Sequence, residues 1–246
     1  MKTFRADLHI HTVLSPCGDL DMSPKNIVNK AKQMGLDIIG ITDHNSTLQC
    51  KGICTEAGKH GLFILMGAEV TTKEEAHCLV FFGDQEKLAE FQQYLDLHLQ
   101  NFKNDTSRFG YQVVVDENEM IEYEEERLLI LAIDQSIDQV EHKVHELGGL
   151  FIPAHVDKSK NSIISQLGFI PMDLAVDALE ISSNTSKTAY LMKQGYLKNY
   201  TFIQNSDAHI LEEIGKKVTT FELEEPTFPE IIMALRGIDG RNVSLI

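Results

Sequence analysis

Histidine placement is the feature that most restricts the fold of this chain, which has 10 histidines among 246 residues. Four of them fall in stretches whose apolar spacing predicts helices: His60, His98, His142 and His145. Five lie at or just beyond the C-terminal end of a predicted strand: His9, His11, His44, His155 and His209. His77 lies near the start of another. Because parallel α/β barrels assemble active sites at the C-terminal ends of their strands, this pattern favours such a barrel.

Short apolar runs alternate with helical stretches along most of the chain. Strands are expected at residues 4–11, 36–42, 62–66, 76–82, 150–154, 178–182 and 201–204. Helices are expected at about 23–34, 47–60, 85–99 and 136–147, and a last one opens at a capping box, 227–230. This alternation predicts an α/β protein with parallel strand pairing, either a barrel or a doubly wound sheet.

Residues 101–132 depart from the alternation. The segment YQVVVDENEMIEYEEERLLI predicts a hairpin and an acidic connector inserted between two barrel units. Neither a linker rich in proline and serine nor an internal repeat interrupts the sequence. Residues 1–246 are therefore predicted to form a single domain that carries this insertion.

Charge and composition restrict the partners. The formal net charge is −15, and a protein that coats nucleic acid or an anionic membrane needs clustered lysine and arginine. No apolar run approaches the roughly 20 residues of a membrane-spanning helix. Residues 1–12 lack the apolar stretch of a signal peptide, and 4 cysteines are too few for a disulfide scaffold. We therefore expect a cytoplasmic protein that has no membrane partner. A long nucleic acid is disfavoured as its substrate.

The histidines are accompanied by carboxylates in the pattern of a metal site. His9 and His11 have strand spacing, so both rings lie on one face and can reach one ion. Asp43 precedes His44, and Glu69 follows another strand. Imidazole with carboxylate suits Zn, Mn or Fe, whereas Mg prefers oxygen ligands. The set predicts a centre for divalent metal ions.

Six motifs, in order from residue 7 to residue 209, resemble those of the PHP (polymerase and histidinol phosphatase) family. They are DLHIHT (7–12), TDHN (42–45), GAEVTT (67–72), EAHCLVFF (75–82), PAHV (153–156) and SDAH (206–209). The resemblance implies a distorted (β/α)7 TIM-like barrel with two or three metal ions at its C-terminal rim. It also implies hydrolysis of phosphate esters.

The resemblance further implies three groups of metal ligands. The first ion would have four ligands: His9, His11, Asp207 and Glu69. Glu69 would bridge to a second ion, whose other ligands would be His77 and His155. His44 and His209 would hold a third ion, and the motifs leave undecided which residue is its remaining ligand.

Many relatives have Ser-Asp-Gly soon after the His-x-His motif, whereas this chain has the longer SPCGDLDMSP. Counting back from Ser23-Pro24 places Asp19 at the position of the aspartate, and counting forward from His11 places Cys17 there. Asp19 is favoured because a carboxylate matches the other ligands. Cys17 stays open as a ligand for a softer metal.

Catalysis is expected to rest on Glu69, Asp207 and His209, around a hydroxide that bridges two ions. Asp7 and Asp43 are expected to orient the metal-binding imidazoles. Three residues are candidates for contacting the substrate: Lys158, Asn184 and Arg127.

The expected activity is hydrolysis of a phosphate ester of a small phosphorylated metabolite or nucleotide. One alternative is a 3′-end nuclease on short oligonucleotides, which would need a basic groove or stacking aromatic side chains beside the metals. The other is a regulatory metal-binding module without catalysis.

Overall fold

The computed structural model describes residues 1–245. Its main sheet has the strand order β11-β10-β1-β2-β3-β4-β7. The bounds are β1 (Lys2–Ile10), β2 (Ile38–Ile41), β3 (Phe63–Thr71), β4 (His77–Phe82), β7 (Leu150–Pro153), β10 (Thr219–Leu223) and β11 (Asn242–Leu245). A second, parallel pair is formed by β8 (Leu179–Ile181) and β9 (Phe202–Gln204).

Backbone hydrogen bonds connect the second pair to both sides of the main sheet. Val156, just after β7, donates to Glu180 of β8 at 2.8 Å. After β9, Ala208 donates to His9 at 3.1 Å and accepts from His11 at 2.9 Å. Strands β1, β2, β3, β4, β7, β8 and β9 therefore follow one another in a ring, which confirms the distorted TIM-like barrel.

The direction of β4 differs from the expected parallel pairing. It runs antiparallel to β3, with Thr71 opposite His77, and antiparallel to β7. Only residues 72–76 separate β3 from β4, and a parallel connection needs a crossover of a dozen residues or more. The start of β4 consequently lies at the edge where the parallel strands end. This explains why His77, at a strand start, joins the other histidines.

The helices are α1 (Pro24–Gln33), α2 (Cys50–Gly58), α3 (Gln85–His98), α4 (Thr106–Phe109), α5 (Ile137–Glu146), α6 (Ile163–Leu167), α7 (Lys187–Lys193) and α8 (Phe228–Leu235). Ser23 caps α1 by accepting from the Asn26 amide, as expected. The predicted capping box of α8 is wrong, because Thr227 makes no side-chain cap bond. The Glu230 carboxylate instead accepts from the Glu224 amide and pairs with Arg241.

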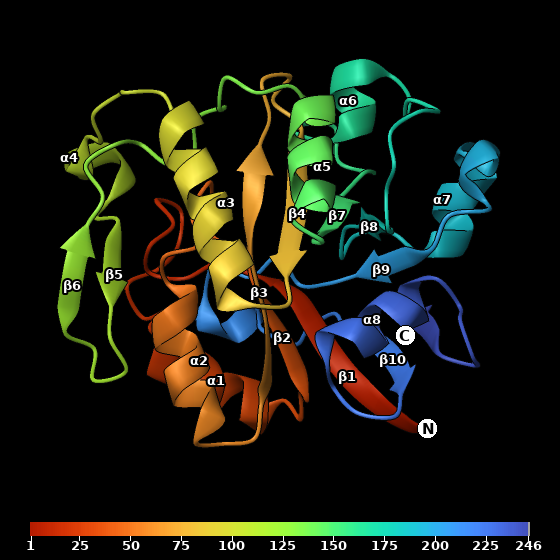
Figure 1. Cartoon of the computed structure of the whole chain (residues 1–246), viewed down its shortest axis with the longest axis horizontal. Coiled ribbons are helices and arrows are strands. Elements are labelled where there is room, and N and C mark those ends of the chain that lie inside the picture. The colour runs from red at the N-terminus through yellow and green to blue at the C-terminus, as the bar shows by residue number, and fades with distance from the viewer. Residues whose placement is uncertain (246) are drawn as a thin grey trace.

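The expected hairpin is present in the insertion as β5 (Val113–Val115) and β6 (Ile121–Glu124). Figure 1 shows it with α4 at one flank of the molecule, at the opposite end from α7. The Gln49 side chain donates to the carbonyl of Val115 and accepts from its amide, at 2.8 and 3.0 Å. The hairpin is thereby tied to the segment that follows β2.

Alternate residues of the strands pack into two separate apolar layers. Ile39 and Val80 belong to the layer that packs against α1, α2, α3 and α5. Their neighbours Ile38 and Leu79 belong to the other layer, which α8 covers. Burial on both faces accounts for the nearly continuous apolar runs in these strands. Within residues 1–245, no helix is long and apolar enough to cross a membrane.

Candidate metal centre

Glu69, near the end of β3 and 1% exposed, lies at the centre of the histidine cluster. Its Oε1 lies 2.9 Å from His77 Nδ1 and 3.1 Å from His155 Nε2. Its Oε2 lies 3.2 Å from His44 Nδ1 and 3.4 Å from His11 Nε2. One buried carboxylate therefore faces imidazoles from four different segments of the barrel.

Asp207 provides a second carboxylate beside Glu69. Its Oδ1 lies 3.3 Å from His9 Nε2 and 3.6 Å from His11 Nε2. His9 Nε2 is also 3.4 Å from Glu69 Oε1, so His9 lies between the two acids. The backbone carbonyl of Asp207 lies 2.9 Å from His209 Nδ1, which assigns the proton to Nδ1 and leaves Nε2 free.

Two predicted ligands have unusual backbone conformations. His155 has φ 30° and Asp207 has φ 57°, the left-handed region that residues other than glycine rarely adopt. Both directly follow barrel strands, at the rim. Backbone strain of this kind persists where the surrounding structure requires it, and it is concentrated at functional sites.

The charges of the cluster shift the pKa values of its members in opposite directions. Burial alone would raise the pKa of Glu69, but His77 and His9 hold it well below its usual value. The pKa of Asp207 is likewise held low against burial, chiefly by His9. Burial and the neighbouring His11 lower the pKa of His209 to about 4. The carboxylates are thus ionised and the His209 imidazole is neutral at pH 7, the forms that bind cations.

The cluster fits divalent metal ions. Among residues 1–245, His44 Nδ1 is buried beside Glu69 without a hydrogen-bond partner, which is costly unless another ligand satisfies it. His9 Nε2 and His11 Nε2 face each other at 3.2 Å. Two three-residue groups could each hold an ion: His9, His11 and Glu69, and His44, Glu69 and His77. Neutral imidazoles with carboxylates are donors for Zn, Mn or Fe.

A third group contains Cys17, and Asp19 is not among its members. The ligand atoms of this group all lie within 4.8 Å of one another, and its residues are His11, Cys17, His44 and His209. Asp19 is exposed, and its Oδ1 accepts from the Asp21 amide at 2.9 Å. The placement therefore favours Cys17, against the preference for Asp19 drawn from the sequence.

Glu180 is a partner of the cluster that the sequence analysis missed. It lies on β8, 2% exposed, and its two oxygens lie 3.1 and 3.0 Å from His9 Nδ1. It also accepts from the Asn205 side chain and the His155 amide. A carboxylate on the far nitrogen fixes the tautomer of a metal-binding histidine, which leaves His9 Nε2 free. The only signal was an acidic residue in the apolar strand LEI.

The two aspartates expected to orient imidazoles have different roles. Asp43 accepts from the Ser15 hydroxyl at 2.6 Å, and Ser15 Oγ lies 3.0 Å from His11 Nδ1, so Asp43 acts on His11 through Ser15. Among residues 1–245, the Asp7 carboxylate has backbone amides and no imidazole as hydrogen-bond partners. It accepts from the amides of Ser206 and Gly215, at 3.0 and 2.8 Å, and so fixes the loop that carries Asp207. Burial raises its pKa to about 6.

One of the three candidate substrate residues reaches the centre. Lys158 forms an ion pair with Asp207. Burial would lower the pKa of this lysine, but the Asp207 carboxylate raises it. Asn184 is exposed, and the bond that it makes is from its amide to the Ser182 hydroxyl.

The assignment of Arg127 to substrate is not supported by its contacts. Its guanidinium donates to Glu125 at 2.9 Å and to Asp96 at 2.9 Å, which ties the insertion to α3. Those carboxylates raise the pKa of Arg127 further. A guanidinium paired in this way has its donors in use and is a structural group.

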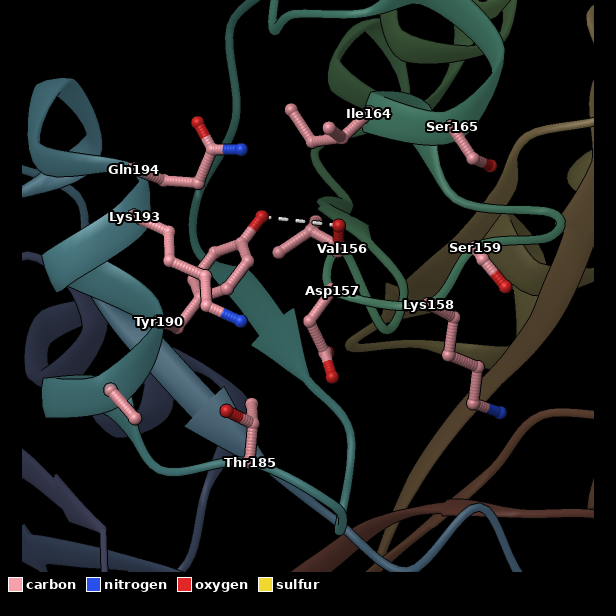
Figure 2. A pocket seen from close by; sticks show the side chains of 11 residues that line it. Val156, Asp157, Lys158, Ser159, Ile164, Ser165, Thr185, Tyr190, Lys193 and Gln194 are labelled. Carbon is pink, nitrogen blue, oxygen red and sulfur yellow. Dashed lines mark hydrogen bonds between the residues drawn. The ribbon is translucent and has the colours of Figure 1, made fainter.

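Two hollows adjoin the cluster. The first, of about 460 Å³, has Lys158 at one side and Lys193 of α7 at the other, as Figure 2 shows. Hydroxyl groups of Ser159, Ser165 and Thr185 also line it. The second, of about 340 Å³, lies between the Cys17 loop and the insertion, and its lining includes Phe109 and Tyr111. Lys158 connects the first hollow to the cluster through Asp207, and Cys17 connects the second to it through its histidine neighbours.

The chain matches known families and proteins over most of its length. A family profile described as "PHP domain" matches residues 7–156, and one described as "PHP-associated" matches residues 198–237. The uncharacterized protein YqxK of Bacillus subtilis is 26% identical over 278 aligned positions, covering 99% of this chain and 64% of that protein.

Solved structures share the fold. The lesion-specific endonuclease PfuEndoQ from Pyrococcus furiosus aligns with a TM-score of 0.72 and 22% identity, over 98% of this chain and 58% of its own. A two-domain protein from Bacteroides vulgatus with a predicted PHP-like metal-dependent phosphoesterase aligns at 0.59 and 16% identity, over 100% of this chain and 65% of its own. This chain therefore spans less than two thirds of these proteins.

These structures correct the expectation about the substrate. A further Endonuclease Q structure, with the same TM-score of 0.72, is a complex with a 27-mer duplex that has an abasic lesion at the active site. The expectation of a small phosphorylated substrate, with long nucleic acid disfavoured, is therefore wrong. It rested on the net charge of the whole chain, whereas binding depends on the charges around the site.

Proposed function

This chain belongs to the PHP domain family, and we propose that it is a metal-dependent nuclease that hydrolyses a phosphodiester bond of a nucleic-acid strand. The observation that carries the proposal is the buried Glu69 carboxylate, which faces imidazoles on both of its oxygens with Asp207 beside it. A carboxylate placed in this way would be a ligand for two divalent ions, which together would supply the chemistry of phosphodiester hydrolysis.

When bound, the divalent ions would supply Lewis acidity that polarises the phosphate and lowers the pKa of water. The first ion would have His9, His11, Glu69 and Asp207 as ligands, and the second Glu69, His77 and His155. Glu180 and Ser15 hold protons on the far nitrogens of His9 and His11, which keeps the near nitrogens free.

Lys158 and His209 are the groups proposed to act on the substrate. Lys158 lies beside Asp207 at the edge of the first hollow, where an ammonium group can neutralise a non-bridging phosphate oxygen. His209 holds its proton on Nδ1, so its Nε2 can bind an ion or accept a proton.

The two hollows support a nucleic-acid substrate. A strand that presents one phosphate to the metal centre would place a neighbouring phosphate near Lys193 and a base near Phe109 or Tyr111. Aromatic side chains stack on bases of any sequence, and lysine attracts the backbone. The fold likeness to Endonuclease Q supports the same substrate class. The chain spans 58% of PfuEndoQ, so the lesion specificity of that protein is not carried over.

The test uses protein purified without chelators and loaded with Mn, Fe or Zn. Substrates are end-labelled single-stranded and duplex oligonucleotides, with and without an abasic site, with free or blocked ends. We expect metal-dependent cleavage that is lost by a factor of at least about 10³ in Glu69→Gln. Glu222→Gln, on β10 and bonded to Thr3, is the matched control and should cleave normally. A metal-loaded protein that cleaves none of these oligonucleotides would overturn the proposal.

A further inference from the structure

Cys17 lies among the histidines of the cluster, but it is not a ligand of either of the two ions that Glu69 and Asp207 would hold. Its Sγ lies within 4.8 Å of ligand atoms of His11, His44 and His209. The other cysteines, Cys50, Cys54 and Cys78, belong to the apolar layer beneath the helices or pack against it. Cys17 is thus set apart from them by its imidazole neighbours.

The loop before α1 is built to hold Cys17 there. The Gly18 amide donates to the carbonyl of Ser15 at 2.9 Å, and the Asp19 amide donates to the carbonyl of His209 at 2.9 Å. A Cβ on Gly18 would come within 2.2 Å of the Thr12 carbonyl oxygen, so the tight approach of this loop requires glycine. Backbone contacts on both sides of Cys17 therefore fix it beside His209.

The nitrogens of the three histidines can be assigned in turn. His11 Nδ1 is bonded to Ser15, and its Nε2 faces Glu69 and Asp207, so His11 serves the first ion. His209 keeps Nε2 free. His44 is 3% exposed, and its Nδ1 has no hydrogen-bond partner among residues 1–245, although Glu69 Oε2 lies 3.2 Å away. His44 therefore belongs both to the group with Glu69 and His77 and to the group with Cys17 and His209, and in the second group it can serve a third ion.

We propose that Cys17 binds the third ion as a thiolate, together with His44 and His209, and that this donor set selects zinc over manganese. Thiolate is a soft ligand that favours zinc, and Mn prefers oxygen ligands. Three protein ligands leave one position of a tetrahedral zinc open, which is the arrangement of catalytic zinc sites. The thiol proton is released to water when the metal binds. The inference rests on the metal centre of the proposed function and not on its substrate.

Cobalt substitution tests this directly, because a thiolate bound to Co²⁺ gives a charge-transfer absorption in the near ultraviolet that imidazole and carboxylate ligands do not give. The apoprotein is titrated with Co²⁺, and the spectrum and bound metal are recorded. The wild type should show the band and lose it when Zn²⁺ displaces cobalt. Cys17→Ser should lack the band and bind about one ion fewer per chain. Mn²⁺ should displace cobalt from the band-forming site at least about tenfold less well than Zn²⁺.

Two controls make the result specific to Cys17. Cys54→Ser, on α2 and partly buried, and Asp19→Asn should both keep the band and the wild-type metal content. Cobalt uptake without the band, or loss of the third ion in Asp19→Asn but not in Cys17→Ser, would overturn the inference. Absence of any cobalt uptake would overturn it together with the metal centre. Because the readout needs no turnover, a protein with the band but without nuclease activity would refute only the proposed function.

Discussion

Each histidine of the centre has one nitrogen turned to the cluster, and for His9, His11 and His209 the hydrogen-bond partner of the other nitrogen decides which one it is. Glu180 has this role for His9 and Ser15 has it for His11, so the free nitrogens converge on Glu69 and Asp207. A metal site of this kind depends on residues that touch no metal.

Replacement of Glu180 tests that dependence. Glu180→Ala should weaken metal binding at the first site by a factor of about 10–100, because His9 loses the carboxylate that sets its tautomer and orientation. The affinity is measured by competition with a chromogenic chelator. Glu180→Gln, which retains a hydrogen-bond acceptor, should lose less affinity than Glu180→Ala. Equal affinities for wild type and Glu180→Ala would show that His9 is oriented without it.

The metal-binding motifs were visible in the sequence because each lies at a strand end, where the barrel topology makes them meet. Glu180 was missed because a residue in the middle of a three-residue strand carries no signal for its partner across the barrel. The choice between Cys17 and Asp19 needed the path of the loop, which spacing alone does not determine. The metal ligands themselves, the catalytic roles and the metal identity stay predictions.

Among the elements, β4 shows that the apolar pattern of a sequence predicts a strand but not the direction in which it runs. Its apolar run predicted a strand with correct bounds to within a residue, yet strand direction depends on the connection to β3. The insertion was predicted as a hairpin, but the hollow that it shares with the Cys17 loop was not, because that hollow is lined by segments about 90 residues apart.

The aromatic residues of the insertion provide a test of the substrate class. Tyr111→Ala should raise the KM for a single-stranded oligonucleotide by a factor of about 5–100, since a stacked base contributes roughly 1–3 kcal/mol. Hydrolysis of bis(p-nitrophenyl) phosphate, which has no flanking nucleotides, should be unchanged. Tyr123→Ala is the matched control, because Tyr123 is exposed on β6 and bonds to Glu125. An equal effect of both substitutions would argue against stacking at Tyr111.

His145, in the last turn of α5, makes the stability of that helix dependent on pH. Its Nε2 bonds to Asp177 at 2.9 Å, and Asp177 with Glu141 raises its pKa. A histidine whose pKa is raised by folding stabilises the folded state below its unfolded pKa of about 6.5 and loses that contribution as pH rises through the folded pKa.

His145→Gln should therefore lower the free energy of unfolding by about 1–2 kcal/mol at pH 6 and by much less at pH 9. Urea denaturation at the two pH values, at constant metal content, measures the difference. His142→Gln, exposed on the same helix, should show no such difference. A loss in His145→Gln that is the same at both pH values would assign the effect to packing.

For the whole molecule, net charge proved a poor guide to partners. The formal charge of −15 is a sum over the whole chain, whereas Lys158 pairs with Asp207, Lys193 lines the same hollow, and bound ions would add local positive charge. The sequence gives the order of the charges along the chain but not their positions around a site, so net charge was a wrong reason to disfavour long nucleic acid.

Metal removal should destabilise the whole barrel, because the ligands come from strands around the ring. An ion at 1,000 times its Kd contributes about 4 kcal/mol to stability, equivalent to about 8–16 °C in Tm for a chain of this size. Calorimetry before and after dialysis against a chelator measures the shift, and Zn²⁺ should restore it. Glu69→Gln should show a smaller shift, and an unchanged wild-type Tm would contradict metal binding at the ring.

The bonds between Ala208 and β1 have a consequence for biosynthesis. His9 and His11 are synthesised long before their partner Asp207, which lies on the segment that closes the ring from the other end. A nascent chain that has released only residues 7–156, the span of the PHP profile, holds imidazoles with no second acid to complete the first site. The ligand set proposed for the first ion is therefore complete only after residue 207 has been synthesised and the ring has closed.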